Sequence, residues 1–282
     1  WRGMTPPTTT TTTTRGSVSA SASRSSCRLG QAGTRRSCRN LWGGRLNGRG
    51  RIGAGRGTLI AREPKEIRSW PSGRPKPLPA SPCPTPRDVT DFVRAAEDDL
   101  LFDHSRRVFL FGALQGLRRG LHPDLELLYV GAMFHDLGLT AGYRGSALRF
   151  EVDGANAARD FLLERGIDKA DADKVWLSIA LHTTPGIPEF MGPEIALVTA
   201  GVETDVLGIG RDDLSPDALD AVTAAHPRPN FKRRILGAFN DGMKHRPHST
   251  FGTVNADVLA HFDPAFVRED FVETILRNSW PE

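Results

Sequence analysis

Five residues of the sequence combine the side-chain types of a metal site with spacings that place them on inner faces of helices. They are His104, the adjacent pair His135 and Asp136, His182 and Asp205. Imidazole nitrogen and carboxylate oxygen together suit zinc and similar divalent ions. A single histidine on an apolar helix face is more often a hydrogen-bonded core residue than a ligand. The order His…His-Asp…Asp, with every member facing inward, is much harder to attribute to chance.

The apolar residues around each candidate follow helical spacing. Asp205 ends a stripe that includes Ile195 and Val198, at the spacing of one helix face. A lone carboxylate there would be costly to desolvate, so we expect it to be paired, protonated or bound to metal. Comparable stripes on three other predicted helices contain His104, His135 and His182.

Amphipathic segments separated by Gly and Pro fill the chain from residue 85 onwards. No strand-period alternation competes with them, which predicts an all-α bundle. The predicted helices are residues 87–119 with a break near Asp103, 124–137, 154–165, 171–182, 193–207, and two or three more within 215–280, of which 257–262 and 268–277 are the clearest.

The charge of the chain is divided unevenly. Residues 1–76 contain fourteen Arg and two Lys but only Glu63 and Glu66, a net charge of +14, so the whole-chain value of +4 leaves −10 for the remainder. The first 84 residues also carry a threonine run and Ser-, Gly- and Pro-rich stretches, which cannot bury enough apolar surface to offset chain entropy. We therefore divide the chain into a disordered leader, residues 1–84, and a helical domain, residues 85–282.

The leader has three interpretations: an extension without function, an organelle transit peptide, or an Arg-rich tail that holds nucleic acid weakly through phosphates. Cys27, Cys38 and Cys83 all lie in it, so neither disulfides nor a thiolate metal site supports the helical domain. No apolar stretch is long enough to span a bilayer, and no secretory apolar segment is present. We expect a cytoplasmic protein with a small-molecule substrate and without a membrane or specific nucleic-acid partner, and leave its oligomeric state open.

The segment Ala132-Met-Phe-His135-Asp136-Leu-Gly138, with His104 before it and Asp205 after it, resembles the H…HD…D signature of the HD-domain superfamily of metal-dependent phosphohydrolases. The resemblance covers about residues 98–210. It implies an HD-domain helical bundle in which His104, His135, Asp136 and Asp205 bind one divalent metal ion, zinc first, with manganese, iron or nickel as alternatives. Segments similar to the cyanamide hydratase-like branch are His104–Arg107, His135–Thr140, Arg149–Ala155 and Ile179–His182.

One departure from the superfamily limits the number of metal ions. Two-metal HD phosphodiesterases place extra histidine ligands between the HD pair and the position of His182, whereas this chain has none there. Phe150 stands about where such a ligand would be expected. The resemblance therefore favours one metal and argues against a cyclic-dinucleotide phosphodiesterase.

We expect a metal-activated water to attack a small molecule held in the bundle core. Asp136 would bind the metal and also orient the water or move its proton. His182 would polarise the substrate or act as a general acid, unless it is a structural core histidine. Arg107, one helical turn from His104, would contact an anionic substrate or serve as a salt-bridge partner.

Three functions remain open from the sequence. The first is hydration of a small neutral nitrile, as in cyanamide hydratase-like proteins, which the apolar helix faces around the candidate ligands favour. The second is hydrolysis of a small phosphate ester or nucleotide, which needs clustered cations; only Arg107, Arg144 and Arg149 are placed to help. The third is a catalytically silent binding or regulatory HD domain, against which the complete set of candidate ligands argues.

Overall fold

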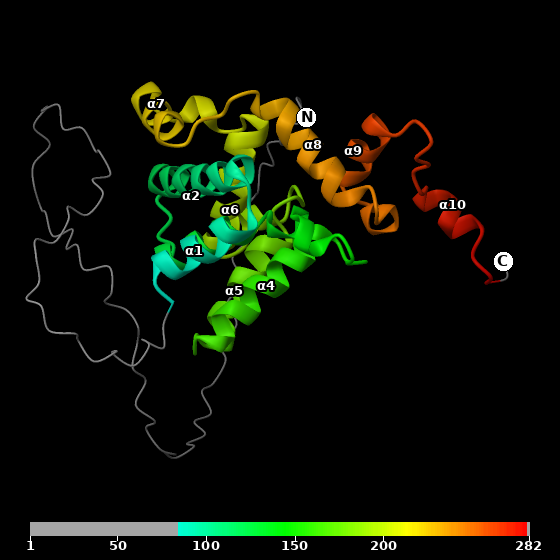
Figure 1. The fold of residues 1–282 in the computed structure, drawn as a ribbon, viewed down its shortest axis with the longest axis horizontal. Coiled ribbons are helices and arrows are strands. Elements are labelled where there is room, and N and C mark those ends of the chain that lie inside the picture. Colours follow the sequence, from blue (N-terminus) through cyan, green and yellow to red (C-terminus); the bar gives the residue numbers. More distant parts are fainter. Residues whose placement is uncertain (1–83, 281–282) are drawn as a thin grey trace, which may run out of the picture. The chain divides into compact units, whose positions relative to one another are not determined.

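A computed structural model describes residues 84–280, and all regular secondary structure in that range is helical (Figure 1). The predicted all-α fold is confirmed. The predicted leader, residues 1–84, lies outside the described residues except for Pro84. No helix within 84–280 is long and apolar enough to cross a membrane. The α-helices are α1 Pro86–Ala96, α2 Asp99–Arg119, α3 Leu125–Phe134, α4 Phe150–Glu164, α5 Lys169–Ala180, α6 Pro193–Val202, α7 Pro216–Ala225, α8 Phe231–Met243, α9 Asn255–Phe262 and α10 Phe271–Leu276.

The longest predicted segment, residues 87–119, is two helices, and the predicted break near Asp103 is wrong. The chain turns just before Asp98, whose side chain accepts a hydrogen bond from the backbone N–H of Leu101 and so begins α2. Such a cap satisfies a backbone donor that the first turn of a helix leaves unpaired. α2 then runs unbroken to Gly120, which has the left-handed conformation (φ 66°) that favours glycine.

α4 begins at Phe150, earlier than the predicted start at Gly154. Gly154 lies inside the helix because α4 packs closely on α3: a β-carbon built on it would lie 2.7 Å from the carbonyl oxygen of Phe134. Glycine is therefore required here by packing, and it does not mark a helix end. The earlier start brings Phe150 and Glu151 onto a helix.

Residues 215–280 form four α-helices where two or three were predicted. α9 begins at Asn255, close to the predicted start, and α10 is shorter than the predicted 268–277. α8 packs against α9 and against the 3-10 turn η1, Leu137–Leu139, which directly follows Asp136. α8 thus lies against the turn that follows α3.

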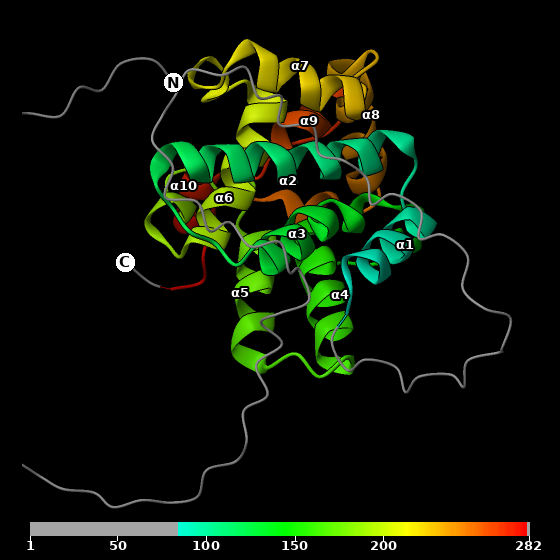
Figure 2. The same ribbon diagram turned by 90° about the vertical axis from the view of Figure 1, so that its left-hand side faces the viewer.

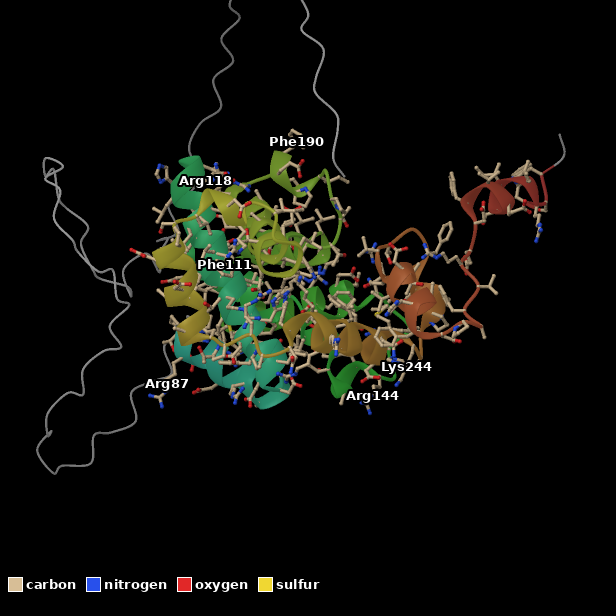
Figure 3. All side chains as sticks on the ribbon, turned by 90° about the horizontal axis from the view of Figure 1, so that it is seen from above. Arg87, Phe111, Arg118, Arg144, Phe190 and Lys244 are labelled. Carbon is tan, nitrogen blue, oxygen red and sulfur yellow. The ribbon has the colours of Figure 1, made fainter. Side chains whose placement is uncertain are left out.

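α2 is the helix around which the others are arranged. It contacts α3, α6, α7 and α8, and α4 and α5 pair with each other below α3 (Figure 2). His104 on this helix was predicted to face inward, and it is buried together with Val108 and Phe111, while Arg87 and Lys244 lie at the outside (Figure 3). Burial of apolar surface at about 25 cal/mol per Å² is the main favourable contribution to folding.

α2 and α6 cross at glycines. A β-carbon built on Gly112 would lie 2.6 Å from the carbonyl oxygen of Leu197, and one on Gly201 would lie 2.2 Å from a carbonyl oxygen of α2. Neither separation is sterically allowed, so the helices approach this closely only with glycine at both positions. Because α2 carries His104 and α6 leads to Asp205, this crossing sets how close these two residues lie.

We predict that Gly201→Ala lowers the free energy of unfolding by about 1–3 kcal/mol, because the added methyl group must separate α2 from α6. Urea unfolding followed by circular dichroism measures it. Gly237→Ala on α8 is the control, since no heavy atom lies within 4 Å of a β-carbon there. The better helix propensity of alanine should leave its stability unchanged or raise it by up to about 1 kcal/mol. Equal losses in both variants would contradict the close crossing.

Candidate metal centre

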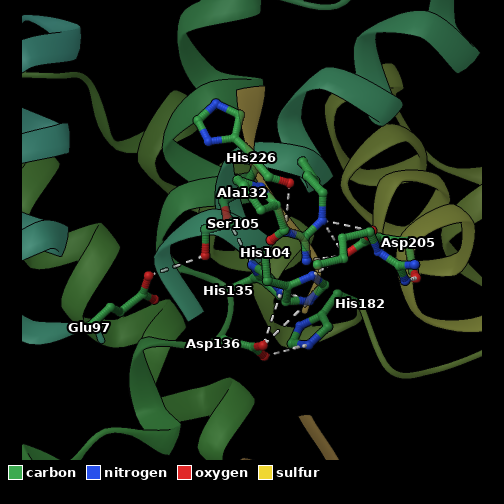
Figure 4. A network of polar contacts seen from close by, with 12 residues as sticks. Glu97, His104, Ser105, Ala132, His135, Asp136, His182, Asp205 and His226 are labelled. Carbon is green, nitrogen blue, oxygen red and sulfur yellow. Dashed lines mark hydrogen bonds and ion pairs between the residues drawn. The ribbon is translucent and has the colours of Figure 1, made fainter. Parts of the chain in front are cut away.

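The imidazole of His104 projects from α2 into the interior and is fully buried (Figure 4). Its Nδ1 lies 2.7 Å from Oδ2 of Asp205, and its Nε2 lies 3.2 Å from Nε2 of His135. An ionised carboxylate only accepts hydrogen bonds, so Nδ1 of His104 carries the proton. Nε2 of the neutral ring therefore presents a lone pair to the interior.

α3 ends at Phe134, and the side chains of the next two residues, His135 and Asp136, lie beside His104. Nδ1 of His135 lies 2.7 Å from the carbonyl oxygen of Ala132, which leaves its Nε2 directed at His104. Asp136 leaves the α-helical conformation (φ −101°, ψ 4°) and places Oδ2 3.4 Å from Nε2 of His135 and 3.6 Å from that of His104. Both carboxylate oxygens of Asp136 are buried without a hydrogen-bond partner among the described residues.

His182 follows α5 and joins the group at the other oxygen of Asp136. Its Nδ1 lies 2.6 Å from the carbonyl oxygen of Ile179. Its Nε2 lies 3.7 Å from Oδ1 of Asp136 and has no hydrogen-bond partner in the described part of the chain. Its ring packs edge-on against His135, with centroids 4.9 Å apart. Three buried histidines and one carboxylate are thus brought together, as Figure 4 shows.

These separations suit a divalent metal ion. One ligand atom from each of His104, His135 and Asp136 lies within 4.8 Å of the other two. Zinc bound tetrahedrally at about 2.0–2.1 Å has its ligand atoms roughly 3.3–3.4 Å apart, and the separations here are 3.2–3.6 Å. Each imidazole is also oriented by an oxygen acceptor at Nδ1, as is usual for metal-binding histidines. The residues present therefore fit a divalent metal ion.

The structure places Asp205 differently from the other three predicted ligands. It lies in a π-helical turn, Glu203–Leu207, that continues α6. Its oxygens accept hydrogen bonds from Nδ1 of His104 at 2.7 Å and from Arg107 at 2.9–3.1 Å, and Nε of Arg228 lies 2.9 Å away. Asp205 is therefore a paired buried carboxylate, one of the three states expected for it, and lies outside the close group at Nε2 of His104.

Arg107 is fully buried, and its geometry favours the second of its two predicted roles, that of a salt-bridge partner. In addition to Asp205, it donates through Nη1 to the carbonyl oxygens of His226 and Pro227, at 3.2 and 3.0 Å. Its guanidinium group also stacks on Phe231, 4.8 Å from the ring centroid. These donors are thus directed at protein acceptors.

Burial lowers the pKa of His182 to about 4, with the charge of His135 adding to the effect. Burial also lowers the pKa of His104, although its bond to Asp205 opposes this. Burial alone would raise the pKa of Asp136, but His135 and His104 lower it instead. Burial would likewise raise the pKa of Asp205, but His104 and Arg107 lower it.

The pKa of His135 is raised, because Asp136 outweighs the lowering effect of burial. A proton on His135 and a metal ion would therefore compete for the same carboxylate. Since histidine ligands must be neutral, metal binding to this group is coupled to proton release.

Two phenylalanines line the site, and the sequence analysis predicted neither of them to do so. The ring of Phe150 lies 5.5 Å from that of His182, and the ring of Phe231 lies 5.2 Å from that of His104; both are buried. The only signal for Phe150 was its place where a second-metal ligand would be expected. Phe231 gave none, because it directly precedes the charged run Lys232–Arg234.

Two buried carboxyl groups near the site also received no predicted role. Glu97 accepts a hydrogen bond from Ser105 at 3.3 Å, and burial, followed by the charge of Asp136, raises its pKa well above the ordinary value. Glu151 accepts hydrogen bonds from Arg149 at 2.9 Å and from Thr183 and Asn255. Glu97 directly precedes Asp98 and Asp99, and such an acidic run is typical of an exposed helix N-terminus. Its burial was therefore not apparent from the sequence.

In a comparison with known protein families, residues 101–222 match the family model of the HD domain. The matched segment runs from α2 into α7 and contains His104, His135, Asp136 and Asp205. It supports assignment of this part of the chain to the HD-domain superfamily, whose members are typically metal-dependent hydrolases. No curated protein matches the chain. The cyanamide hydratase-like branch therefore stays a prediction.

Arg107→Ala is expected to lower the free energy of unfolding by about 3–5 kcal/mol, because loss of one partner leaves the buried carboxylate of Asp205 short of a cation. Arg118→Ala, on the same helix, is the matched control. Its ion pair with Asp213 is half-exposed, with side chains 42% and 48% accessible, so about 0–1 kcal/mol should be lost. If urea denaturation gave the same small loss for both, Arg107 would not be needed to hold Asp205.

Proposed function

We propose that the chain is a metal-dependent hydratase of a small neutral nitrile, similar in activity to cyanamide hydratase-like proteins and carried by its HD domain. The observation that carries the proposal is the environment of the metal-type group formed by His104, His135 and Asp136. Apolar rings border this group, and the arginines beside it are already paired with carboxylates.

The pairing of the arginines argues against a phosphate ester as substrate. A phosphate group is normally met by cations that are free to bind it. Of the three arginines that the sequence offers for this purpose, Arg107 is paired with Asp205 and Arg149 with Glu151, each at 2.9 Å. The third, Arg144, is exposed and lies at the outer edge of the bundle (Figure 3). A neutral substrate makes no demand on any of them.

The apolar wall favours a small uncharged molecule. Phe150 and Phe231 belong to one buried cluster that also contains Leu139, Ile235 and Met243. Such a wall provides contact surface for an apolar or weakly polar substrate but no partners for several anionic oxygens. A nitrile needs only one polar region, around its carbon and nitrogen.

In the proposed reaction one water adds across the C≡N bond of cyanamide: the oxygen bonds to carbon, both hydrogens end on the nitrile nitrogen, and urea results. A bound divalent ion, zinc first, supplies acidification of water, to a pKa of about 7. His104, His135 and Oδ2 of Asp136 would hold that ion. Oδ1 of Asp136, which has no hydrogen-bond partner among residues 84–280, would take a proton from water and pass it to nitrogen.

The test is urea formation from cyanamide by the full chain, loaded in turn with zinc, manganese, iron and nickel. We expect metal-dependent urea, and a loss of at least about 100-fold in Asp136→Ala, which removes both a ligand and a proton acceptor. His248→Ala, at an exposed histidine that contacts the carbonyl oxygen of Ala147 through Nε2, should retain the activity.

Absence of urea from a folded, metal-loaded sample would reject cyanamide as the substrate. Release of inorganic phosphate from p-nitrophenyl phosphate by that same sample would instead support the phosphohydrolase alternative. A metal-loaded chain that does neither would favour a binding or regulatory HD domain.

A further inference from the structure

Five large apolar side chains are exposed on two turns that both pack against α6. Phe190, on the 3-10 turn η3 (Pro188–Phe190), is 83% exposed and projects at the outer edge of the domain (Figure 3). Leu207, at the end of the π-helical turn that continues α6, is 64% exposed. Both turns contact α6, so they lie on the same part of the surface. The apolar patch that they form consists of Ile187, Phe190, Met191, Leu207 and Ile209.

Hydrogen bonds and packing fix the two turns, so the exposure of the patch is built into the fold. Pro188 is buried and anchors η3. Nε2 of Gln115 donates to the carbonyl oxygen of Gly210 at 2.8 Å, and the hydroxyl of Thr204 donates to that of Ile209 at 2.9 Å. Side chains held in this way lose little entropy when a partner covers them. Apolar side chains gathered on a fixed surface indicate an interaction site, whereas scattered ones do not.

Charged side chains of both signs border the apolar patch. Negative charge lies beside η3. Burial raises the pKa of Glu203, and the like charge of Glu189 raises it further, by more than Arg119 lowers it. Positive charge comes from Arg119, which ends α2, and from Arg211, which follows the second turn. Glu189, Arg119 and Arg211 are all exposed, so they are accessible to a partner.

A second copy of the chain matches this combination of apolar and charged groups. In a two-fold dimer the same surface of each copy faces the other, so the apolar patch would cover its own counterpart. The two-fold rotation also brings the acidic side of one patch towards the basic side of the other. A partner of a single charge sign would match only one of the two sides. An apolar centre with an aromatic anchor and a polar rim is the usual composition of such interfaces.

We propose that the chain forms a two-fold dimer through the apolar patch, with Phe190 at the centre and Glu189 of each copy facing Arg211 of the other. The proposal depends neither on the metal site nor on the proposed reaction. Its failure and that of the hydratase proposal are therefore observed separately.

Light scattering after size-exclusion chromatography, over a range of protein concentrations, measures the molar mass of the full chain. We expect twice the mass of a single chain. Phe190→Glu should give a monomer, because the dimer would bury the new carboxylate in an apolar centre. Phe271→Glu is the matched control, since Phe271 on α10 is 66% exposed and lies outside the patch. This variant should remain a dimer.

A charge exchange tests the facing pair by analytical ultracentrifugation. Glu189→Arg should raise the dimer dissociation constant by at least about 10-fold, because it places like charges opposite each other. Adding Arg211→Glu to that variant should restore the wild-type constant. A double variant that is no tighter than Glu189→Arg alone would contradict the pairing.

An unaltered chain that stays monomeric at every concentration would overturn the proposal. So would a dimer that Phe271→Glu dissociates and Phe190→Glu does not, which would place the contact at α10. Both substitutions are at exposed positions, and circular dichroism confirms that the variants keep the helical content of the unaltered chain.

Discussion

The buried carboxylate of Asp136 is the group on which the rest of the site depends. It is fully buried, its two oxygens have no hydrogen-bond partner in residues 84–280, and its nearest polar neighbours are imidazole nitrogens. An ionised carboxylate in such surroundings is costly unless a cation compensates it. The neighbouring histidines lower the pKa of Asp136, so protonation of the carboxylate does not remove this cost. The compensating charge at Asp136 would come from a protonated His135, whose pKa this carboxylate raises, or from a bound metal ion.

Successive contacts around Asp136 hold this arrangement in place. The carbonyls of Ala132 and Ile179 orient two of the histidines, and Asp205 orients the third. Asp205 is in turn held by Arg107 and Arg228, both of which stack on Phe231 of α8. Each contact beyond the ligands restricts the rotamers of the next residue inward, which is how a site keeps its geometry.

A second network fixes the turn that follows Asp136. Arg246, which is buried, donates to the carbonyl oxygens of Gly138 at 2.7 Å and Leu148 at 2.9 Å and pairs with Asp153 of α4. The chain after α8 is therefore tied to the segment that leaves the HD pair. Residues outside the segment matched to the HD domain thus contribute to the geometry of the site within it.

Helical spacing predicted the helices and the inward orientation of the candidate ligands, because one buried face imposes a regular pattern on the sequence. It did not predict the partners of Asp205. Arg228 lies in the loop before α8, and only the packing of that loop against α2 and α6 brings it to a carboxylate 23 positions earlier in the chain. The predicted start of α4 at Gly154 was wrong for a similar reason. Close packing on α3, which helical spacing does not encode, requires glycine at this position inside the helix.

The buried carboxylates around the site differ in how their charge is compensated. Asp205 is matched by Arg107 and Arg228, and Asp153 by Arg246. Elsewhere Glu151 is matched by Arg149, and burial raises the pKa of Glu97 well above its ordinary value. Of this set only Asp136 has imidazoles and no guanidinium group beside it. Asp136 is therefore the buried carboxylate of this set that a bound metal ion would compensate, because the histidines beside it present lone pairs. Because the arginines are paired with the other carboxylates, the surroundings of Asp136 offer apolar rings and little uncompensated positive charge, the environment that the proposed neutral substrate would require.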